Sequence, residues 1–164
     1  MMEILEMSEG EVDALLGRVG YGHFACSWEN QPYVVPINYA YDKPLIYIYT
    51  TAGLKSEILK HNPLVCLQVE EVREEGGWKS VVVTGEAVVI EDRLEREKAV
   101  NFVRSANPRL LPALAIKWTN NWIRENKEVV YKVKVLTVTG LSGSEVYRAA
   151  AAAQPAFHPT KNNS

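Results

Sequence analysis

Cysteine, histidine and unbalanced charge are all scarce in this 164-residue chain, and each scarcity excludes a class of protein. Two cysteines, Cys26 and Cys66, are too few for the disulfide framework of a small secreted domain. The 18 Lys and Arg residues meet 20 Asp and Glu residues, and the formal net charge of −2 leaves no basic surface for nucleic acid. His23 has only Cys26 at a plausible ligand spacing, so we predict no metal site.

Long hydrophobic runs are missing as well. No uninterrupted apolar stretch approaches the roughly 18 residues that would cross a bilayer. The N-terminal residues Met-Met-Glu-Ile-Leu-Glu lack the basic start and apolar run of a signal peptide. We therefore expect a cytoplasmic protein with no membrane segment. With 47% apolar and 23% charged residues, the chain suffices for one well-buried domain and is too short for two.

The spacing of the apolar residues predicts a β-rich chain with interspersed helices. Ser8 and Glu11 form a capping-box pattern at the start of the first helix. Alternating apolar residues predict strands over residues 21–28, 31–41, 45–49, 64–71, 78–91 and 129–141. Helices are expected over residues 9–18, 55–60, 92–106 and 109–124.

Six antiparallel strands in one domain favour closure into a small barrel, because an open sheet would expose its edges. The strands over residues 78–91 and 129–141 carry more apolar surface than such a barrel buries internally. This excess predicts that an outer face packs on a second subunit, forming a homodimer. The domain is expected over residues 1–148, followed by a disordered tail over 149–164 that has no apolar period.

The strand over residues 45–49 ends in Tyr49-Thr50-Thr51-Ala52-Gly53-Leu54-Lys55, a pattern suited to a phosphate. A helix start exposes unpaired N–H groups, while the hydroxyls of Thr50 and Thr51 donate hydrogen bonds and Lys55 adds a positive charge. An ordinary strand-to-helix turn would use the same residues for local reasons. The pattern alone leaves both interpretations open.

Three further segments lie in a fixed order around this corner: Val35-Pro36-Ile37-Asn38, Asn62-Pro63, and Trp78-Lys79-Ser80-Val81 before Gly85. Together the four segments resemble the FMN-binding split-barrel family of pyridoxamine phosphate oxidase-like proteins, and most of all its nitroimidazole-resistance-protein branch. The resemblance spans roughly residues 9–143. It implies a mainly β protein with helices, folded as a six-stranded antiparallel split β-barrel, and a homodimer with FMN at the subunit interface.

The resemblance also implies roles for single residues. Lys55 would be the cation for the FMN phosphate, with Tyr49 and Thr50 bonded to the phosphate or the ribityl chain. Ser80 would stand where the oxidases keep a glutamine beside the flavin. The full set of cofactor-binding residues expected is Val35, Pro36, Ile37, Asn38, Tyr49, Thr50, Thr51, Lys55, Trp78, Lys79, Ser80, Trp118 and Trp122.

Departures from the family pattern limit what the resemblance implies. The oxidases usually carry an arginine where this chain has Leu54, and their substrate-binding arginine and histidine have no match in residues 132–148. Pyridoxamine phosphate oxidation is therefore not expected. The nitroimidazole branch often has histidine where this chain has Tyr49. Trp118 and Trp122, spaced at i and i+4, would either line the flavin or pack in the core or an interface.

Three functions remain open. The first is an FMN-dependent oxidoreductase that passes electrons from a nicotinamide donor to a small electrophile such as a nitroaromatic or a quinone. Because the flavin supplies that chemistry, the lack of a Ser-His-Asp or Cys-His pattern is no objection. The second is a flavin- or haem-binding protein without turnover, acting as a sensor, store or scavenger. The third is a dimeric barrel without a cofactor.

Overall fold

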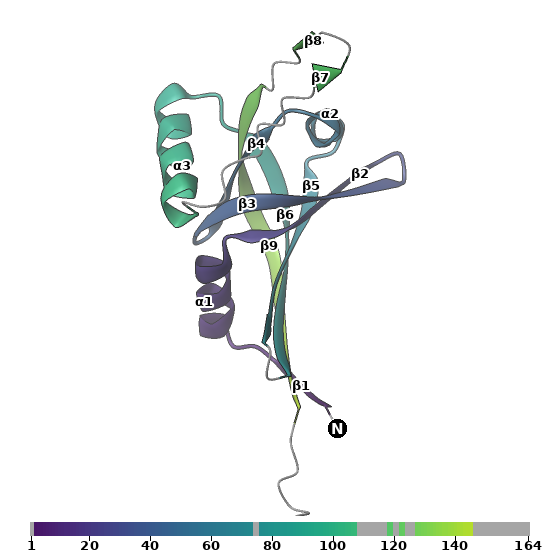
Figure 1. The fold of residues 1–164 in the computed structure, drawn as a ribbon, viewed down its shortest axis with the longest axis vertical. Coiled ribbons are helices and arrows are strands. Elements are labelled where there is room, and N and C mark those ends of the chain that lie inside the picture. The colour runs from purple at the N-terminus through teal and green to yellow at the C-terminus, as the bar shows by residue number, and fades with distance from the viewer. Residues whose placement is uncertain (1, 74–75, 108–117, 120–121, 124–126, 146–164) are drawn as a thin grey trace, which may run out of the picture.

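A closed ring of six antiparallel strands forms the body of the molecule in the computed structural model (Figure 1). The structure describes residues 2–73, 76–107, 118–119, 122–123 and 127–145. The ring runs in the order β9-β4-β3-β2-β5-β6 and closes because β6 also pairs with β9. Its strands are β2 (Tyr21–Trp28), β3 (Gln31–Asp42), β4 (Leu45–Thr51), β5 (Leu64–Arg73), β6 (Gly77–Val89) and β9 (Glu128–Glu145). The six-stranded antiparallel barrel predicted from the sequence is confirmed.

A seventh strand, β1 (Met2–Glu6), extends the sheet beside the C-terminal half of β9. This strand is not among those predicted from the spacing of apolar residues. Its Ile4 and Leu5 side chains are exposed, so the strand carries no buried apolar face that alternation could reveal. The register with β9, from Met2 opposite Glu145 to Glu6 opposite Leu141, holds it in place through backbone hydrogen bonds.

Three helices cover the barrel at different places (Figure 1). They are α1 (Glu9–Val19), α2 (Leu54–His61) and α3 (Arg93–Ala106). The Ser8 capping box and the Asp92 N-cap form as predicted, because each side-chain oxygen accepts a hydrogen bond from the third helical residue. In Figure 1, α1 and α2 lie toward opposite ends of the barrel and α3 packs on its side.

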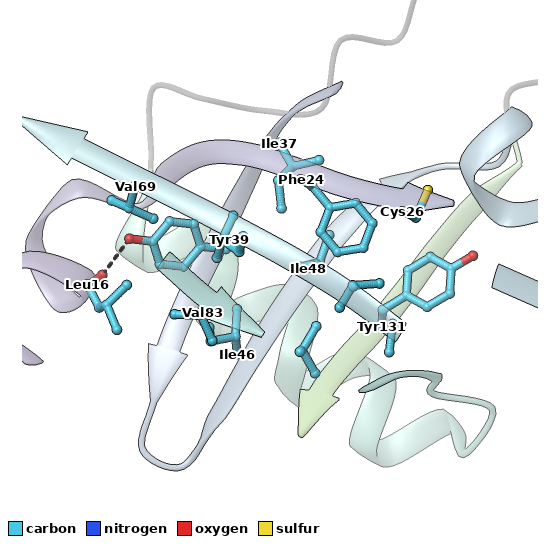
Figure 2. Packing of buried hydrophobic residues seen from close by; sticks show 14 of the residues in the cluster. Leu16, Phe24, Cys26, Ile37, Tyr39, Ile46, Ile48, Val69, Val83 and Tyr131 are labelled. Carbon is cyan, nitrogen blue, oxygen red and sulfur yellow. Dashed lines mark hydrogen bonds between the residues drawn. The ribbon is translucent and has the colours of Figure 1, made fainter. Parts of the chain in front are cut away.

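The apolar core has two clusters, one inside the barrel and one between the barrel wall and α3. The inner cluster joins the barrel interior to α1 and α2 and includes Phe24, Tyr39, Ile46, Ile48, Leu67, Val69, Val81 and Val83 (Figure 2). The second cluster lies between α3 and the strands β3, β4 and β9, and contains Ala40, Tyr49, Ile90, Ala99, Val103 and Val130. Strand β4 is therefore buried on both faces, as its unbroken apolar sequence predicts.

Tyr39 is the point at which β3 is held to both α1 and α3. Its hydroxyl donates a hydrogen bond of 2.9 Å to the carbonyl of Leu16 in α1, the dashed line in Figure 2. Its backbone N–H donates to the carbonyl of Gly20, and its carbonyl accepts from the buried Asn107 amide that caps α3. Gly20 has φ +65°, and a Cβ there would meet the Asn107 side chain at 2.1 Å, so only glycine fits.

The helix predicted over residues 109–124 is wrong where the structure describes that segment. Residues Trp118–Thr119 form β7 and Trp122–Ile123 form β8, paired as a small antiparallel ladder. The i, i+4 spacing of the two tryptophans therefore does not place them on one helical face. The rest of the segment and the tail over 149–164 lie outside the described residues. None of the described helices is long and apolar enough to cross a membrane.

We expect Tyr39→Phe to lower the free energy of unfolding by about 1–3 kcal/mol, because it leaves the Leu16 carbonyl buried without its donor. Urea denaturation at a fixed protein concentration measures the change. Tyr47→Phe is the matched control, because Tyr47 packs edge-on against Phe102 through its ring and should lose less than about 0.5 kcal/mol. Equal stability of the two variants would contradict the role given to the Tyr39 hydroxyl.

Candidate functional site

The barrel wall opens between β3 and β4. These strands pair only from Tyr39 opposite Ile48 to Asp42 opposite Leu45. Beyond that point, residues 31–38 of β3 continue beside β2, whereas the end of β4 continues beside β9. No strand in the described part of the chain pairs with residues 31–38 on the β4 side. The opening therefore presents one edge of β3 backbone toward the end of β4 and the start of α2.

Two prolines mark this edge of β3. The Tyr39 N–H points toward β2, and successive N–H groups alternate in direction along an antiparallel strand. Pro32 and Pro36 are seven and three residues before Tyr39, so their backbone nitrogens point the other way, into the opening. Proline has no N–H there. Proline is tolerated in sheets mainly at such edges. The N–H of Val34 and the carbonyls of Val34 and Pro36 face the same opening and can bond a polar ligand edge.

Lys55 lies in the first turn of α2, which follows the end of β4 that borders the opening. Its Nζ donates a hydrogen bond of 2.6 Å to the Thr51 carbonyl, and no carboxylate of the described residues lies within ion-pair distance of it. Partial burial lowers the pKa of the Lys55 ammonium, opposed by a smaller effect of the nearby Cys26. A half-buried cation without a counter-ion is suited to an anionic ligand.

The first turn of α2 also holds an unsatisfied hydroxyl. Ser56 is buried, and its Oγ has no hydrogen-bond partner among the described residues. It lies with Tyr131 in the lining of a cavity of about 690 Å³ that runs between α2, the end of β6 and the start of β9. Ser56 was not among the residues predicted from the sequence, because its burial depends on how α2 packs against the barrel.

Tyr49 is directed to the α3 side of β4, away from the barrel interior. Its hydroxyl donates a short hydrogen bond to the Glu128 carboxylate and accepts one of 3.4 Å from Arg104. Burial, with a further contribution from Glu128, raises the pKa of Tyr49. Thr50 and Thr51, the last residues of β4, are both partly exposed at the opening. The structure thus brings Thr50, Thr51 and Lys55 together and gives Tyr49 partners elsewhere.

A second group of predicted residues lies on β6. Trp78 and Ser80 are on the outer face of the sheet, where the Trp78 indole covers Gly143. Lys79 points to the opposite face and forms an ion pair of 3.2 Å with Glu11 of α1. The Ser80 hydroxyl lies 3.2 Å from Gln68 Nε2, and Gln68 Oε1 lies 3.0 Å from His23 Nδ1. This polar chain was missed, because it depends on the β2–β5–β6 register.

The two groups are too far apart to hold one small ligand within a single chain. Strands β2 and β5 separate β3 from β6, so three strand spacings of about 4.8 Å, or about 14 Å, lie between Pro36 and Ser80. On the outer face of the sheet, two rows of paired residues run across five strands, and neither row contains Lys, Arg, Asp or Glu. The rows are Pro36, His23, Gln68, Val82 and Thr139, and Val34, Ala25, Cys66, Thr84 and Thr137.

Metal and thiol chemistry find little support in the described residues. They contain no group of three or more His, Cys, Asp or Glu side chains that could hold a metal ion. Cys26 and Cys66 are both free, and burial raises the pKa of each thiol. Raised values disfavour the thiolate, which is the reactive form. The side chains of Trp118 and Trp122 lie outside the described part of the structure, so their cofactor role stays a prediction.

Comparison with known proteins agrees with this geometry. The sequence profile of the pyridoxamine 5'-phosphate oxidase family matches residues 8–142. A FAD-binding protein from Mesorhizobium loti is 30% identical, with a TM-score of 0.71 over 88% of this chain and 100% of that one. A candidate 5-nitroimidazole antibiotic resistance protein from Bacteroides thetaiotaomicron is 20% identical, with a TM-score of 0.66 over 87% and 89% of the two chains. Both share the fold, which confirms the split barrel.

An uncharacterized protein of Rhizobium meliloti (strain 1021) is 37% identical over 84 residues, or 51% of this chain and 56% of that protein. The chain thus spans about half the length of the curated relative that it matches.

We expect Val35→Pro to destabilise the protein by about 3 kcal/mol or more, because the N–H of Val35 points toward β2 and is lost. Val34→Pro is the matched control, since the N–H of Val34 faces the opening, and its cost should stay well below that of Val35→Pro. Urea denaturation of both variants measures the difference. A larger loss for Val34→Pro would contradict the unpaired edge of β3.

Proposed function

This chain belongs to the pyridoxamine 5'-phosphate oxidase family, and from that premise we propose that it binds a flavin in the opening between β3 and β4. The observation that carries the proposal is the presence of two features at one opening: a half-buried Lys55 with no carboxylate partner among the described residues, and the β3 edge at Val34 and Pro36, with which no described strand pairs on the β4 side. A flavin nucleotide requires both features, because its phosphate is anionic and its pyrimidine edge is polar.

The phosphate end is supported by the residues around the start of α2. Lys55 would supply the charge, Thr50 and Thr51 the hydroxyl donors, and the first N–H groups of the helix further donors. Tyr49 is the weakest member of the predicted set, because Glu128 and Arg104 already occupy its hydroxyl.

The ring end is supported by the β3 edge. The carbonyls of Val34 and Pro36 and the N–H of Val34 would meet the polar edge of the ring. The side chains of Val35 and Ile37 face the barrel interior and give this part of β3 a fixed backbone. A bound flavin would supply hydride and single-electron chemistry, while the protein would bind and orient it.

We also propose that two copies of the chain form the complete site. Pro36 and Ser80 are both expected beside one flavin, yet β3 and β6 lie three strand spacings apart, or about 14 Å around the barrel, within one chain. A second copy packed on the uncharged outer face would bring its own Ser80, Trp78 and Gln68 toward the opening. Faces without charged residues that cross five strands are typical of subunit interfaces.

The reaction we propose is electron transfer from a nicotinamide donor through the bound flavin to a small electrophile of the nitroaromatic or quinone type. A flavin-binding protein without turnover, acting as a store or sensor, is the alternative. NADH or NADPH oxidation by the flavin-loaded protein, followed with and without a quinone or nitroaromatic acceptor, distinguishes the two. No oxidation with any acceptor favours the store or sensor.

An absorbance spectrum from roughly 300 to 600 nm of the purified protein, before and after FMN is added, tests flavin binding directly. Perturbed flavin bands would support the proposal. A Soret band would indicate haem, and a protein that leaves the FMN bands unchanged would overturn the proposal.

We expect Lys55→Ala to weaken FMN binding by about 1–3 kcal/mol, because it removes a charge-assisted hydrogen bond to the phosphate. Fluorescence titration with FMN and with riboflavin measures the effect. Riboflavin lacks the phosphate, so its weaker affinity should not change further in the variant. Lys60→Ala is the matched control, because Lys60 lies on the same helix and is paired with Glu57. Unchanged FMN affinity in Lys55→Ala would contradict the phosphate assignment.

We expect Val82→Glu to convert the homodimer to a monomer and to weaken FMN binding at least about tenfold, because it buries a carboxylate at the centre of the proposed interface. Analytical ultracentrifugation and FMN titration measure the two effects. Leu94→Glu is the control, because Leu94 is 67% exposed on α3 and lies away from that face. A Val82→Glu variant that stays dimeric and holds FMN normally would exclude this interface.

A further inference from the structure

An exposed aromatic pair lies at the far end of α2 from Lys55. The Trp28 ring stacks on the His61 ring with centroids 4.2 Å apart and an interplanar angle of 9°. Trp28 is nevertheless 44% exposed, at the tip of the β2–β3 hairpin. An exposed tryptophan that is already backed by a second flat ring is a rigid surface, suited to stacking a further planar group.

The pair is fixed to α2, the helix that also carries Lys55 of the candidate phosphate site. Asn62, which follows α2, donates a hydrogen bond of 2.8 Å to the Ser27 carbonyl and so holds the end of β2 against the end of the helix. Helix α2 as a whole packs against β2. The end of β2 therefore lies beside the end of α2, so Trp28 has a fixed position relative to the helix that carries Lys55.

The separation of the two ends suits a dinucleotide. Six residues of helix at 1.5 Å each place His61 about 9 Å beyond Lys55 along the axis. A second phosphate and a ribose span a comparable length. The one carboxylate of α2, Glu57, is paired with Lys60, so the helix offers no unpaired negative charge to a diphosphate.

We propose that Trp28, backed by His61, is the stacking surface for the adenine ring of FAD, so that the dinucleotide is the preferred form of the cofactor. This inference rests on the proposed flavin site, with the first phosphate at Lys55. Trp28 would contribute to FAD binding and not to FMN binding, because FMN ends at the phosphate. Base–aromatic stacking of this kind has a substantial effect on affinity.

The test compares FAD with FMN on the full-length protein and three variants. Fluorescence or calorimetric titration gives the dissociation constant of each flavin for the wild type, Trp28→Ala, Trp28→Phe and Phe102→Ala. Trp28→Phe keeps an aromatic ring. Phe102→Ala is the matched control, because Phe102 is a partly exposed aromatic residue on α3.

We expect the wild type to bind FAD more tightly than FMN. Trp28→Ala should weaken FAD binding about tenfold and leave FMN binding unchanged, while Trp28→Phe should retain most of the FAD affinity. Equal affinity of the wild type for both flavins, or an equal effect of Trp28→Ala on both, would overturn the adenine assignment and leave flavin binding intact. A wild type that binds neither flavin would overturn the proposed function and this inference with it.

Discussion

The structure depends on the point at which β3 leaves β4. Tyr39 opposite Ile48 is the last pair of that ladder, and the opening begins directly beyond it. A strand edge without a partner would ordinarily close or shift its register, because unpaired backbone groups favour pairing. Here the α1 carbonyl of Leu16, the backbone of Gly20 and the amide of Asn107 hold Tyr39. The barrel can therefore remain open on one side while its interior stays closed and packed.

The same constraint explains why proline occurs twice in a strand of twelve residues. The backbone nitrogens of Pro32 and Pro36 both face the opening, so neither proline removes a hydrogen bond to β2. They also discourage another strand from pairing along the edge, because they offer no donor there. The edge thereby offers carbonyl oxygens and few N–H groups, which is the set of groups that the proposed ligand would meet. Sequence, strand pairing and the proposed site agree at these two positions.

Much of this fold follows from local sequence patterns, and the parts that do not follow depend on long-range register. Alternation located the six barrel strands, and capping residues such as Ser8 and Asp92 located helix starts, because both signals act within a few residues. Strand β1 was missed, since its apolar residues are exposed, and residues 118–123 were assigned the wrong period. The corner at Lys55 is local and was recognisable. The His23–Gln68–Ser80 chain and the Trp28–His61 pair join residues far apart in sequence.

The candidate site is divided between β3 and β6, and this division favours association of two copies of the chain. A single chain offers charge and a backbone edge at one place, and a hydroxyl, an amide and an indole at another, about 14 Å away. In the proposed dimer, a second copy would bring both groups to one ligand. Two rows of described residues between the groups contain no Lys, Arg, Asp or Glu, so a copy packed there would not desolvate an ion in those rows. In such a dimer, flavin binding and subunit association would be coupled, because each subunit would complete the other's site.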